Sequence, residues 1–149
     1  MEEHLFCGKC NEVGKYNGQW IEGFYAVDNG KPVIGQSNDI GLIGYFCEPD
    51  SIGMYTGKTD KNGKKIFEGN IVSIYTPCNE KHNIGVIRFG YYASGIPTIF
   101  KTNLGFYIEW ASEDNINRID FGFWIQAYQD ETEVIGNIHD NPELLEVTK

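Results

Sequence analysis

The sequence lacks any long hydrophobic run. None of the apolar stretches in its 149 residues approaches the roughly 20 residues that a transmembrane helix needs. Its first ten residues, MEEHLFCGKC, are acidic and contain no apolar segment typical of a secretory signal. We therefore expect a cytoplasmic protein that makes no membrane contact. Its four cysteines are then expected to be reduced.

Basic residues are scarce. The chain has 12 Lys and Arg against 21 Asp and Glu, a net charge of −9. Because nucleic-acid affinity depends mainly on Lys and Arg that neutralise phosphates, this balance disfavours nucleic acid as a partner. The C-terminal third is the most acidic part, since Arg118 is the one basic residue between Glu109 and Glu146. Such a surface suits a basic partner.

No segment has the periodicity of a long amphipathic helix. In contrast, 18 glycines and 14% aromatic residues favour strands and tight turns. We predict a mostly β protein: a strongly bent antiparallel sheet or pseudo-barrel with little helix. Its predicted parts are an N-terminal hairpin subdomain, residues 1–50, and a β-rich core, residues 51–149.

Turn-forming residues separate the predicted strands. Asn29-Gly30 can adopt positive φ at both positions, as a type I′ hairpin requires. The glycine-rich residues 35–53 are predicted to be a looser connection. After the last strand, Asn141 and Pro142 are typical of the cap and first position of a short helical turn. The predicted strands are residues 19–27, 66–76, 83–92, 103–110, 118–128 and 133–138.

Three segments resemble a known family. Residues 55–72 read YTGKTDKNGKKIFEGNIV, and residues 134–146 read VIGNIHDNPELLE. In this order and spacing they resemble two motifs of the YopX family of small phage and prophage proteins, and QWIEGFYAVDNGK is similar to its tryptophan-containing hairpin. Asn70 stands where the family usually has Asp. The resemblance implies a mostly β, cytoplasmic, phage- or prophage-encoded protein. No catalytic residues can be carried over, because the family has no established activity.

The first motif contains two sequences that imitate ligand sites. Residues 53–59, GMYTGKT, have three residues between the glycines where a phosphate-binding loop has four, and a turn follows instead of a helix. Asp60-Lys61-Asn62-Gly63 lacks the ligand spacing of a calcium loop. The sequence therefore predicts neither nucleotide nor calcium binding here.

Cys7 and Cys10 have the C-x2-C spacing of paired metal ligands. A closed zinc site needs four ligands, usually from a second pair, but Cys47 and Cys78 stand alone and His4 is the nearest other candidate. We expect four unconnected cysteines and no cofactor. The alternative is a small zinc-dependent protein that uses Cys7 and Cys10.

Lysines and aromatics offer further candidates. The lysine hairpin, Lys58, Lys61, Lys64 and Lys65, is our candidate surface for contact with a partner. Contact with nucleic-acid phosphates is its alternative role. We expect the aromatic residues of the later strands to pack in a core or interface instead of stacking on bases, because their flanking charges are acidic.

No enzyme is expected. The sequence has no G-x-S-x-G motif, and its three histidines are scattered. The leading hypothesis is a non-enzymatic phage or prophage accessory protein that forms a homo-oligomer or contacts a host or phage protein. The alternatives are nucleic-acid binding through the lysine hairpin, an acidic mimic of DNA, and the zinc-dependent protein.

Overall fold

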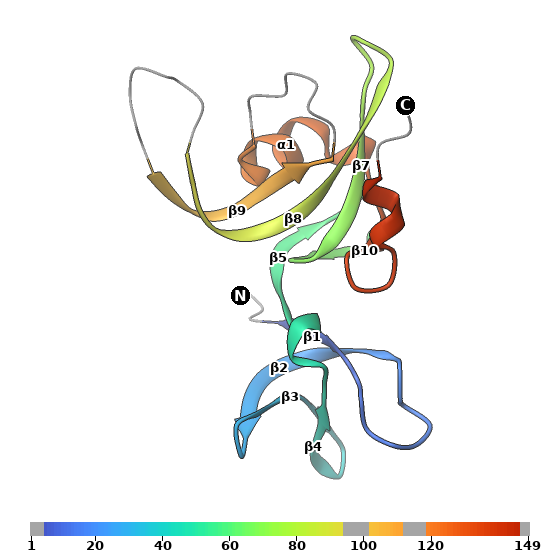
Figure 1. The fold of residues 1–149 in the computed structure, drawn as a ribbon, viewed down its shortest axis with the longest axis vertical. Coiled ribbons are helices and arrows are strands. Elements are labelled where there is room, and N and C mark those ends of the chain that lie inside the picture. The colour runs from blue at the N-terminus through green and yellow to red at the C-terminus, as the bar shows by residue number, and fades with distance from the viewer. Residues whose placement is uncertain (1–4, 94–101, 112–118, 147–149) are drawn as a thin grey trace. The chain divides into compact units, whose positions relative to one another are not determined.

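The computed structural model describes residues 5–93, 102–111 and 119–146. The chain divides into two compact units, Met1–Gly57 and Lys58–Lys149 (Figure 1). The predicted division at residue 50 precedes β5, the strand in which the first unit ends. The described elements are β1 (Phe6–Lys9), β2 (Trp20–Asp28), β3 (Lys31–Asn38), β4 (Gly41–Phe46), η1 (Pro49–Ser51), β5 (Gly53–Thr59), β6 (Lys65–Phe67), β7 (Asn70–Thr76), β8 (Lys81–Ala93), β9 (Thr102–Trp110), α1 (Phe121–Tyr128), η2 (Gln129–Glu131), β10 (Thr132–Asn137) and η3 (Pro142–Leu145).

Two antiparallel sheets dominate the fold. Their strand orders are β4-β3-β2-β1-β5-β6 and β10-β7-β8-β9. The predicted mostly β class with little helix is confirmed. Both sheets are open, so "pseudo-barrel" is only a loose description. None of the helices in the described residues has the length and apolar character needed to cross a bilayer.

The first unit contains the predicted type I′ hairpin. Asn29 and Gly30 have φ of 50° and 77°, and they join β2 to β3 in a two-residue loop. Ile21 and Ile34 point from these strands into a small core that also contains Cys10 and Cys47. This buried cluster is small for a unit of this length, so each member matters to its stability.

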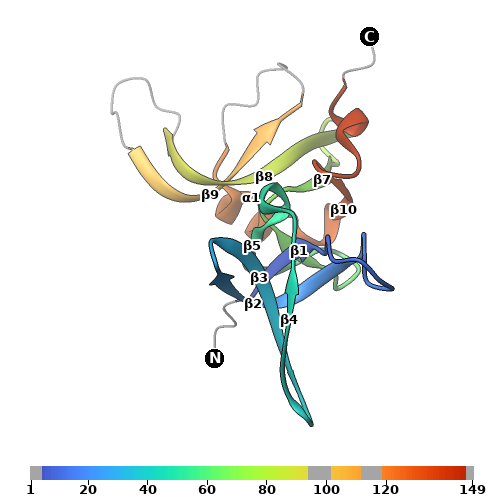
Figure 2. The same ribbon diagram turned by 60° about the horizontal axis from the view of Figure 1, so that its bottom comes forward.

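The prediction of a loose connection over residues 35–53 is wrong. β3 continues to Asn38, and β4 returns beside it as the edge strand of the sheet (Figure 2). The tight turn is held by the Ile40 N–H, which donates to Asn38 Oδ1 at 2.9 Å. Gly41 adopts a φ of 134° that favours glycine. The glycines therefore belong to a hairpin, and the Asn-Asp pair before Gly41 was the turn signal.

The predicted strand over residues 66–76 is interrupted. Gly69 has a φ of 92°, which turns the chain between β6 and β7. Its N–H donates to the carbonyl oxygen of Ile87 at 2.7 Å, and its own carbonyl accepts from the N–H of Ile138 at 2.9 Å. Glu-Gly therefore makes a turn that is hydrogen-bonded to β8 and to the residue that follows β10.

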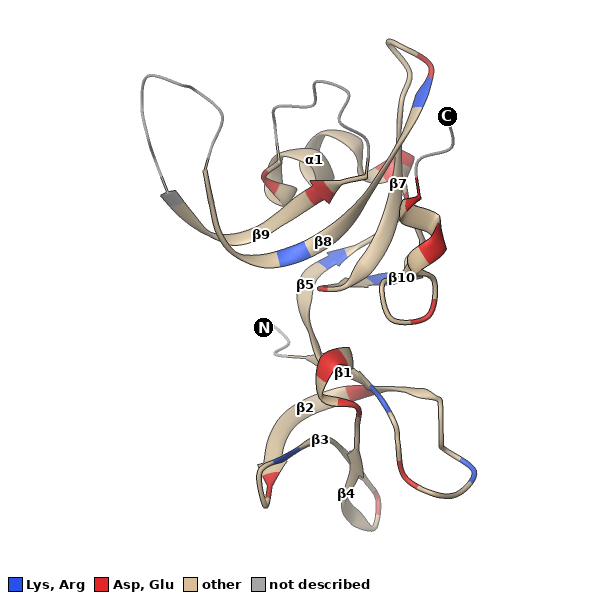
Figure 3. Ribbon diagram, in the orientation of Figure 1, with Lys and Arg blue, Asp and Glu red and all other residues tan. Residues whose placement is uncertain are grey.

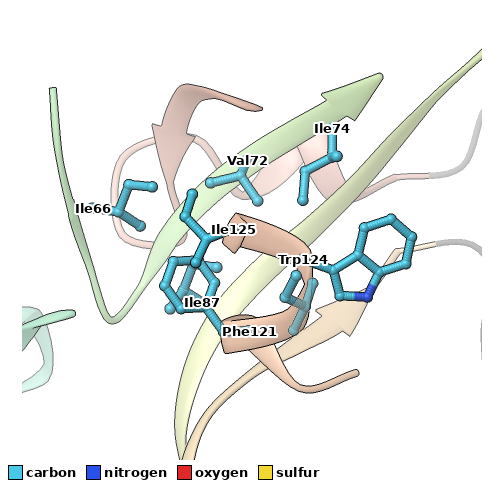
Figure 4. Close-up of a cluster of buried hydrophobic side chains, with 8 residues drawn as sticks. Ile66, Val72, Ile74, Ile87, Phe121, Trp124 and Ile125 are labelled. Atoms are coloured by element: carbon cyan, nitrogen blue, oxygen red, sulfur yellow. The ribbon is translucent and has the colours of Figure 1, made fainter. Parts of the chain in front are cut away.

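The prediction of a strand over residues 118–128 is also wrong. Residues 121–128 form α1, and Figure 4 shows its inward side chains against those of the strands. Phe121, Trp124 and Ile125 are buried, with Tyr128 packed beside them, which is the i, i+3, i+4, i+7 spacing of a helix face. The short aromatic run is compatible with either structure by composition, and its periodicity was the signal for a helix.

The core of the second unit lies between α1 and the strands. Trp110 and Trp124 pack edge to face with ring centroids 5.0 Å apart. Their pairing joins β9 to α1 and adds to the apolar area that both rings bury. The fully buried aliphatic members are Ile66, Val72, Ile74, Ile87 and Ile108.

The C-terminal helical turn is present with Asn141 at its N-cap position, as predicted, but the Asn141 side chain does not cap it. Pro142 lies in the first turn of η3 and Asn141 precedes it. The Asn141 side chain makes no capping bond, because its Oδ1 accepts the N–H of Asn137 at 3.2 Å. Asn141 therefore ties the turn back to β10 instead of stabilising the helical N-terminus.

Candidate interaction surfaces

The lysine hairpin is a tight turn between β5 and β6. Asp60 donates its N–H to the carbonyl of Lys64 at 2.8 Å, and Gly63 donates to the carbonyl of Asp60 at 3.0 Å. Gly63 has a φ of 80°, as in a three-residue hairpin loop that ends in a left-handed residue. The predicted hairpin tip is thus confirmed.

The Asp60 side chain stabilises this tip by accepting backbone hydrogen bonds. Its side chain is only 4% exposed. Oδ1 accepts the N–H groups of Asn62 and Lys64, both at 2.9 Å. Oδ2 accepts the N–H of Val134 in β10, also at 2.9 Å. Charge-assisted bonds of this kind are among the strong hydrogen bonds in proteins. This carboxylate therefore links the hairpin tip to β10.

The two family motifs contact each other at Asp60. Besides the bond from Val134 to Asp60, the N–H of Lys61 donates to the carbonyl of Thr132 at 2.8 Å. Lys61 Nζ lies 3.4 Å from Glu133 Oε2. The motifs, distant in sequence, therefore form one connected scaffold. A sequence alone shows each motif but not their contact.

The four lysines of the hairpin differ in solvent exposure. Lys58, Lys61 and Lys64 are exposed, and Lys65 is half-buried. Because Lys61 pairs with Glu133, part of the positive charge is compensated. Acidic and basic positions are interspersed over the described part of the second unit (Figure 3). The role of this hairpin as a partner contact stays a prediction.

The alternative metal pair, Cys7 and Cys10, is divided between different neighbours. Cys7 pairs with Glu22 and Gly53 across the sheet, whereas Cys10 forms an isolated antiparallel bridge with Cys47. No cluster of three or more His, Cys, Asp or Glu side chains suited to a metal occurs within the described residues. His4 lies outside them, so the zinc alternative stays a prediction.

Cys47 is buried in the small core of the first unit. Its thiol donates to the carbonyl oxygen of Tyr45 at 3.4 Å. Burial raises the pKa of Cys47 to about 11, and the neighbouring Cys10 adds to the rise. Burial also raises the pKa of Tyr45, with Tyr16 contributing. The thiol of Cys47 therefore remains protonated at neutral pH.

Stability is expected to fall in alkali because of Cys47. An unfolded thiol ionises from about pH 8.5, whereas the folded thiol keeps its proton up to about pH 11. The unfolded state then binds fewer protons, so the free energy of unfolding falls across this window, by about 1–2 kcal/mol after allowance for solvent screening. Urea titrations of the reduced protein at several pH values measure this slope.

Cys47→Ser is the comparison for that slope. The free energy of unfolding of Cys47→Ser should fall less between neutral and alkaline pH than that of the wild type, by about 1–2 kcal/mol. Cys78→Ser, which changes an exposed thiol, should keep the wild-type pH dependence. Tyr45 contributes in the same direction in all three proteins, so it cancels. Equal slopes in Cys47→Ser and the wild type would contradict the assignment.

The second surface is the outer edge of β4. Leu42 is 74% exposed and Ile43 is 41% exposed. Residues 40–47 contain no charged residue and no proline. The segment from Gly41 to Tyr45 has no strand on its outer side among the residues that the structure describes. This surface was missed because residues 35–53 were predicted to be a connection.

The C-terminal end of β4, at Phe46, is not open, because residues 11 and 12 bond to it. The N–H of Asn11 donates to the carbonyl of Phe46 at 3.0 Å. The N–H of Phe46 donates to Glu12 Oε1 at 2.9 Å. Pairing with another strand is thereby confined to the part before Phe46.

Aromatic residues of the second unit serve mainly its core. Phe121 and Trp124 are buried, and Phe106 and Trp110 pack against them, which confirms the expected packing role for these four. Phe89, Tyr91 and Phe123 remain exposed. Phe89 contacts Phe106 edge to face, at 5.0 Å between centroids.

Comparison with known proteins supports the family resemblance. The family model described as YopX protein matches residues 10–146. No curated protein matches the chain. The crystal structure of protein EF1440 from Enterococcus faecalis is 23% identical, covers 98% of this chain and 100% of its own, and has a TM-score of 0.48. Because the family model matches most of the sequence, the chain belongs to the YopX family.

Proposed function

We propose that this protein is a non-enzymatic phage or prophage accessory protein of the host cytoplasm that acts through protein contacts. Its first partner is a second copy of itself, bound edge to edge through β4. The observation that carries this proposal is the exposed, apolar and uncharged edge of β4.

An open strand edge is a template for strand pairing. Its unpaired N–H and C=O groups can bind another strand, and proteins usually block such edges with charges, proline or bulges. Residues 40–47 have neither charge nor proline. The exposed side chains of Leu42 and Ile43 would be buried by an added strand, which gains apolar contact in addition to hydrogen bonds.

A second copy fits this edge better than an unrelated acidic protein. An antiparallel pair of identical strands is self-complementary around a two-fold axis. With a net charge of −9, two copies repel over most of their surfaces, and the neutral segment from Gly41 to Tyr45 is a place where they can approach.

Leu42→Lys tests this pairing. It adds a charge to each of two apposed strands, so we expect the dissociation constant of the dimer to rise at least about tenfold. Sedimentation velocity over a range of protein and salt concentrations measures it. Val27→Lys is the matched control, because Val27 is 58% exposed but lies on β2, away from the edge of β4, and pairs with Pro32 of β3.

Two results would reject the self-association. One is a wild-type protein that stays monomeric at every concentration and salt. The other is an equal loss in Leu42→Lys and Val27→Lys, which would show that the edge of β4 is not the contact. Circular dichroism spectra of both variants verify that the strands remain folded.

Nucleic-acid contact through the lysine hairpin is the second candidate. Lys58 and Lys64 are exposed at one turn, which favours it, whereas the ion pair of Lys61 with Glu133 weakens it. An electrophoretic shift assay decides: Lys64→Glu should abolish any shift that the wild-type protein gives. Absence of a wild-type shift at low salt removes this candidate.

A further inference from the structure

Cys10 and Cys47 face each other across two antiparallel segments. They are direct bridge partners, and the backbone hydrogen bonds beside them join their neighbours instead of the cysteines. Such a non-hydrogen-bonded pair has Cα atoms about 4.5 Å apart and its side chains on one face. Two backbone hydrogen bonds flank the pair: the N–H of Asn11 donates to the carbonyl of Phe46 at 3.0 Å, and the N–H of Glu48 donates to the carbonyl of Lys9 at 2.8 Å.

This separation is within the range of a disulfide. Cα atoms of bonded cysteines are usually about 4.4–6.8 Å apart. Cys47 also packs against the backbone of β1, because a Cβ on Gly8 would lie 3.0 Å from its Sγ. Cys7 has Gly53 and Glu22 as its partners, which places it apart from this pair.

We propose that Cys10 and Cys47 are a site of reversible disulfide formation, oxidised by a small aliphatic disulfide of the glutathione type. One cysteine thiolate attacks the small disulfide, which releases one thiol and leaves a mixed disulfide. The thiolate of the other cysteine then attacks the protein sulfur of that mixed disulfide and releases the second thiol. The protein loses two electrons and two protons, and the small disulfide gains both.

The bond would covalently link the two ends of the segment that forms most of the first unit. The sheet order β4-β3-β2-β1 places the bridge between the segment after β1 and the segment after β4. A disulfide here encloses residues 11–46, which contain all of β2, β3 and β4. Two of the four residues in the buried cluster of this unit are these cysteines. A covalent link restricts the unfolded chain more strongly the longer the loop that it closes, and domains with a small core depend most on such links.

Burial sets the conditions for the reaction. Cys10 and Cys47 are 2% and 1% exposed, so an oxidant reaches them only when the unit opens locally. Because the reaction needs this opening and only the thiolate attacks, oxidation is slow at neutral pH and accelerates with rising pH. The site therefore rests reduced and responds to sustained oxidation. This inference is independent of the proposed pairing through β4.

The test uses the full chain under native conditions. We incubate reduced protein with oxidised glutathione at several pH values, quench it with acid, alkylate the free thiols and map the peptides by mass spectrometry without reduction. The expected product is one Cys10–Cys47 cross-link that dithiothreitol reverses and that forms equally in Cys78→Ser and Cys7→Ser. The oxidised first unit should melt about 10 °C higher.

Several outcomes overturn the proposal. One is a Cys7–Cys10 cross-link. Another is a set of mixed glutathione adducts that never resolve into a Cys10–Cys47 bond. A third is reduced Cys10 and Cys47 after prolonged oxidation at alkaline pH. Wild-type mapping needs no substitution in the core, so a variant that fails to fold does not affect the decision.

Discussion

Asp60→Ala is expected to lower the free energy of unfolding of the second unit by about 3 kcal/mol or more. The carboxylate accepts three backbone N–H groups, from Asn62, Lys64 and Val134. Alanine leaves these donors without their acceptor at a site where Asp60 is 4% exposed. The hairpin tip then also loses the side-chain bond that joins it to β10. Urea unfolding followed by circular dichroism measures the change.

Lys61→Ala is the matched control for Asp60. It removes the ion pair with Glu133, whose two side chains are 43% and 42% exposed, and keeps the backbone bond from Lys61 to Thr132. Exposed pairs contribute about 0–1 kcal/mol, so the control should be nearly as stable as the wild type. Similar losses in both variants would contradict the role assigned to the carboxylate.

Gly23→Ala is expected to separate β2 from β3 and to destabilise the first unit by about 3 kcal/mol or more. A Cβ at Gly23 would lie 2.0 Å from the carbonyl oxygen of Gly35. That atom belongs to the backbone of the neighbouring strand, so relief requires movement of the strand itself. Hydrogen exchange read by mass spectrometry should show loss of protection in β2 and β3.

Gly44→Ala provides the comparison within the same unit. Its Cβ would meet only Val33 Cγ1, at 2.8 Å, the end of a side chain that can shift. We expect a loss below about 1.5 kcal/mol. If Gly23→Ala were as mild as Gly44→Ala, the close approach of β2 to β3 would not be essential to the unit.

The predicted turns were largely correct because their causes are local. Asn29 and Gly30 both have positive φ, which glycine and asparagine allow at little cost. Gly63 ends the lysine hairpin for the same reason. The motif that begins at Tyr55 and the hairpin at Asn29 could therefore be placed from a few adjacent residues.

Predictions that depended on distant contacts were less successful. The segment from Phe121 to Tyr128 is an α-helix because Phe121, Trp124 and Ile125 bury one face against the sheet. An isolated helix of eight residues is marginal in water, so packing decides its structure. β4 likewise forms because β3 is available beside it, although its glycines suggested a loose connection.

The candidate sites divide in the same way. The lysines of the hairpin could be located from the sequence, but the pairing of Lys61 with Glu133 could not. The spacing of Cys7 and Cys10 suggested a pair, whereas the backbone pairs Cys10 with Cys47. Asp60 was considered as a calcium ligand and discounted, and its bond to Val134 was not foreseen.

By itself, the sequence determined the mostly β class, the family and the tight turns at Asn29-Gly30 and at the lysine hairpin. The class and the turns follow from composition and from φ preferences that act within a few residues, and the family follows from the resemblance of the motifs at residues 55–72 and 134–146. Only the tertiary structure decided which segments pair, that residues 121–128 are helical, and that Asp60 joins the two family motifs. Burial and strand pairing depend on residues far apart in the chain, and a local pattern is compatible with more than one such partner.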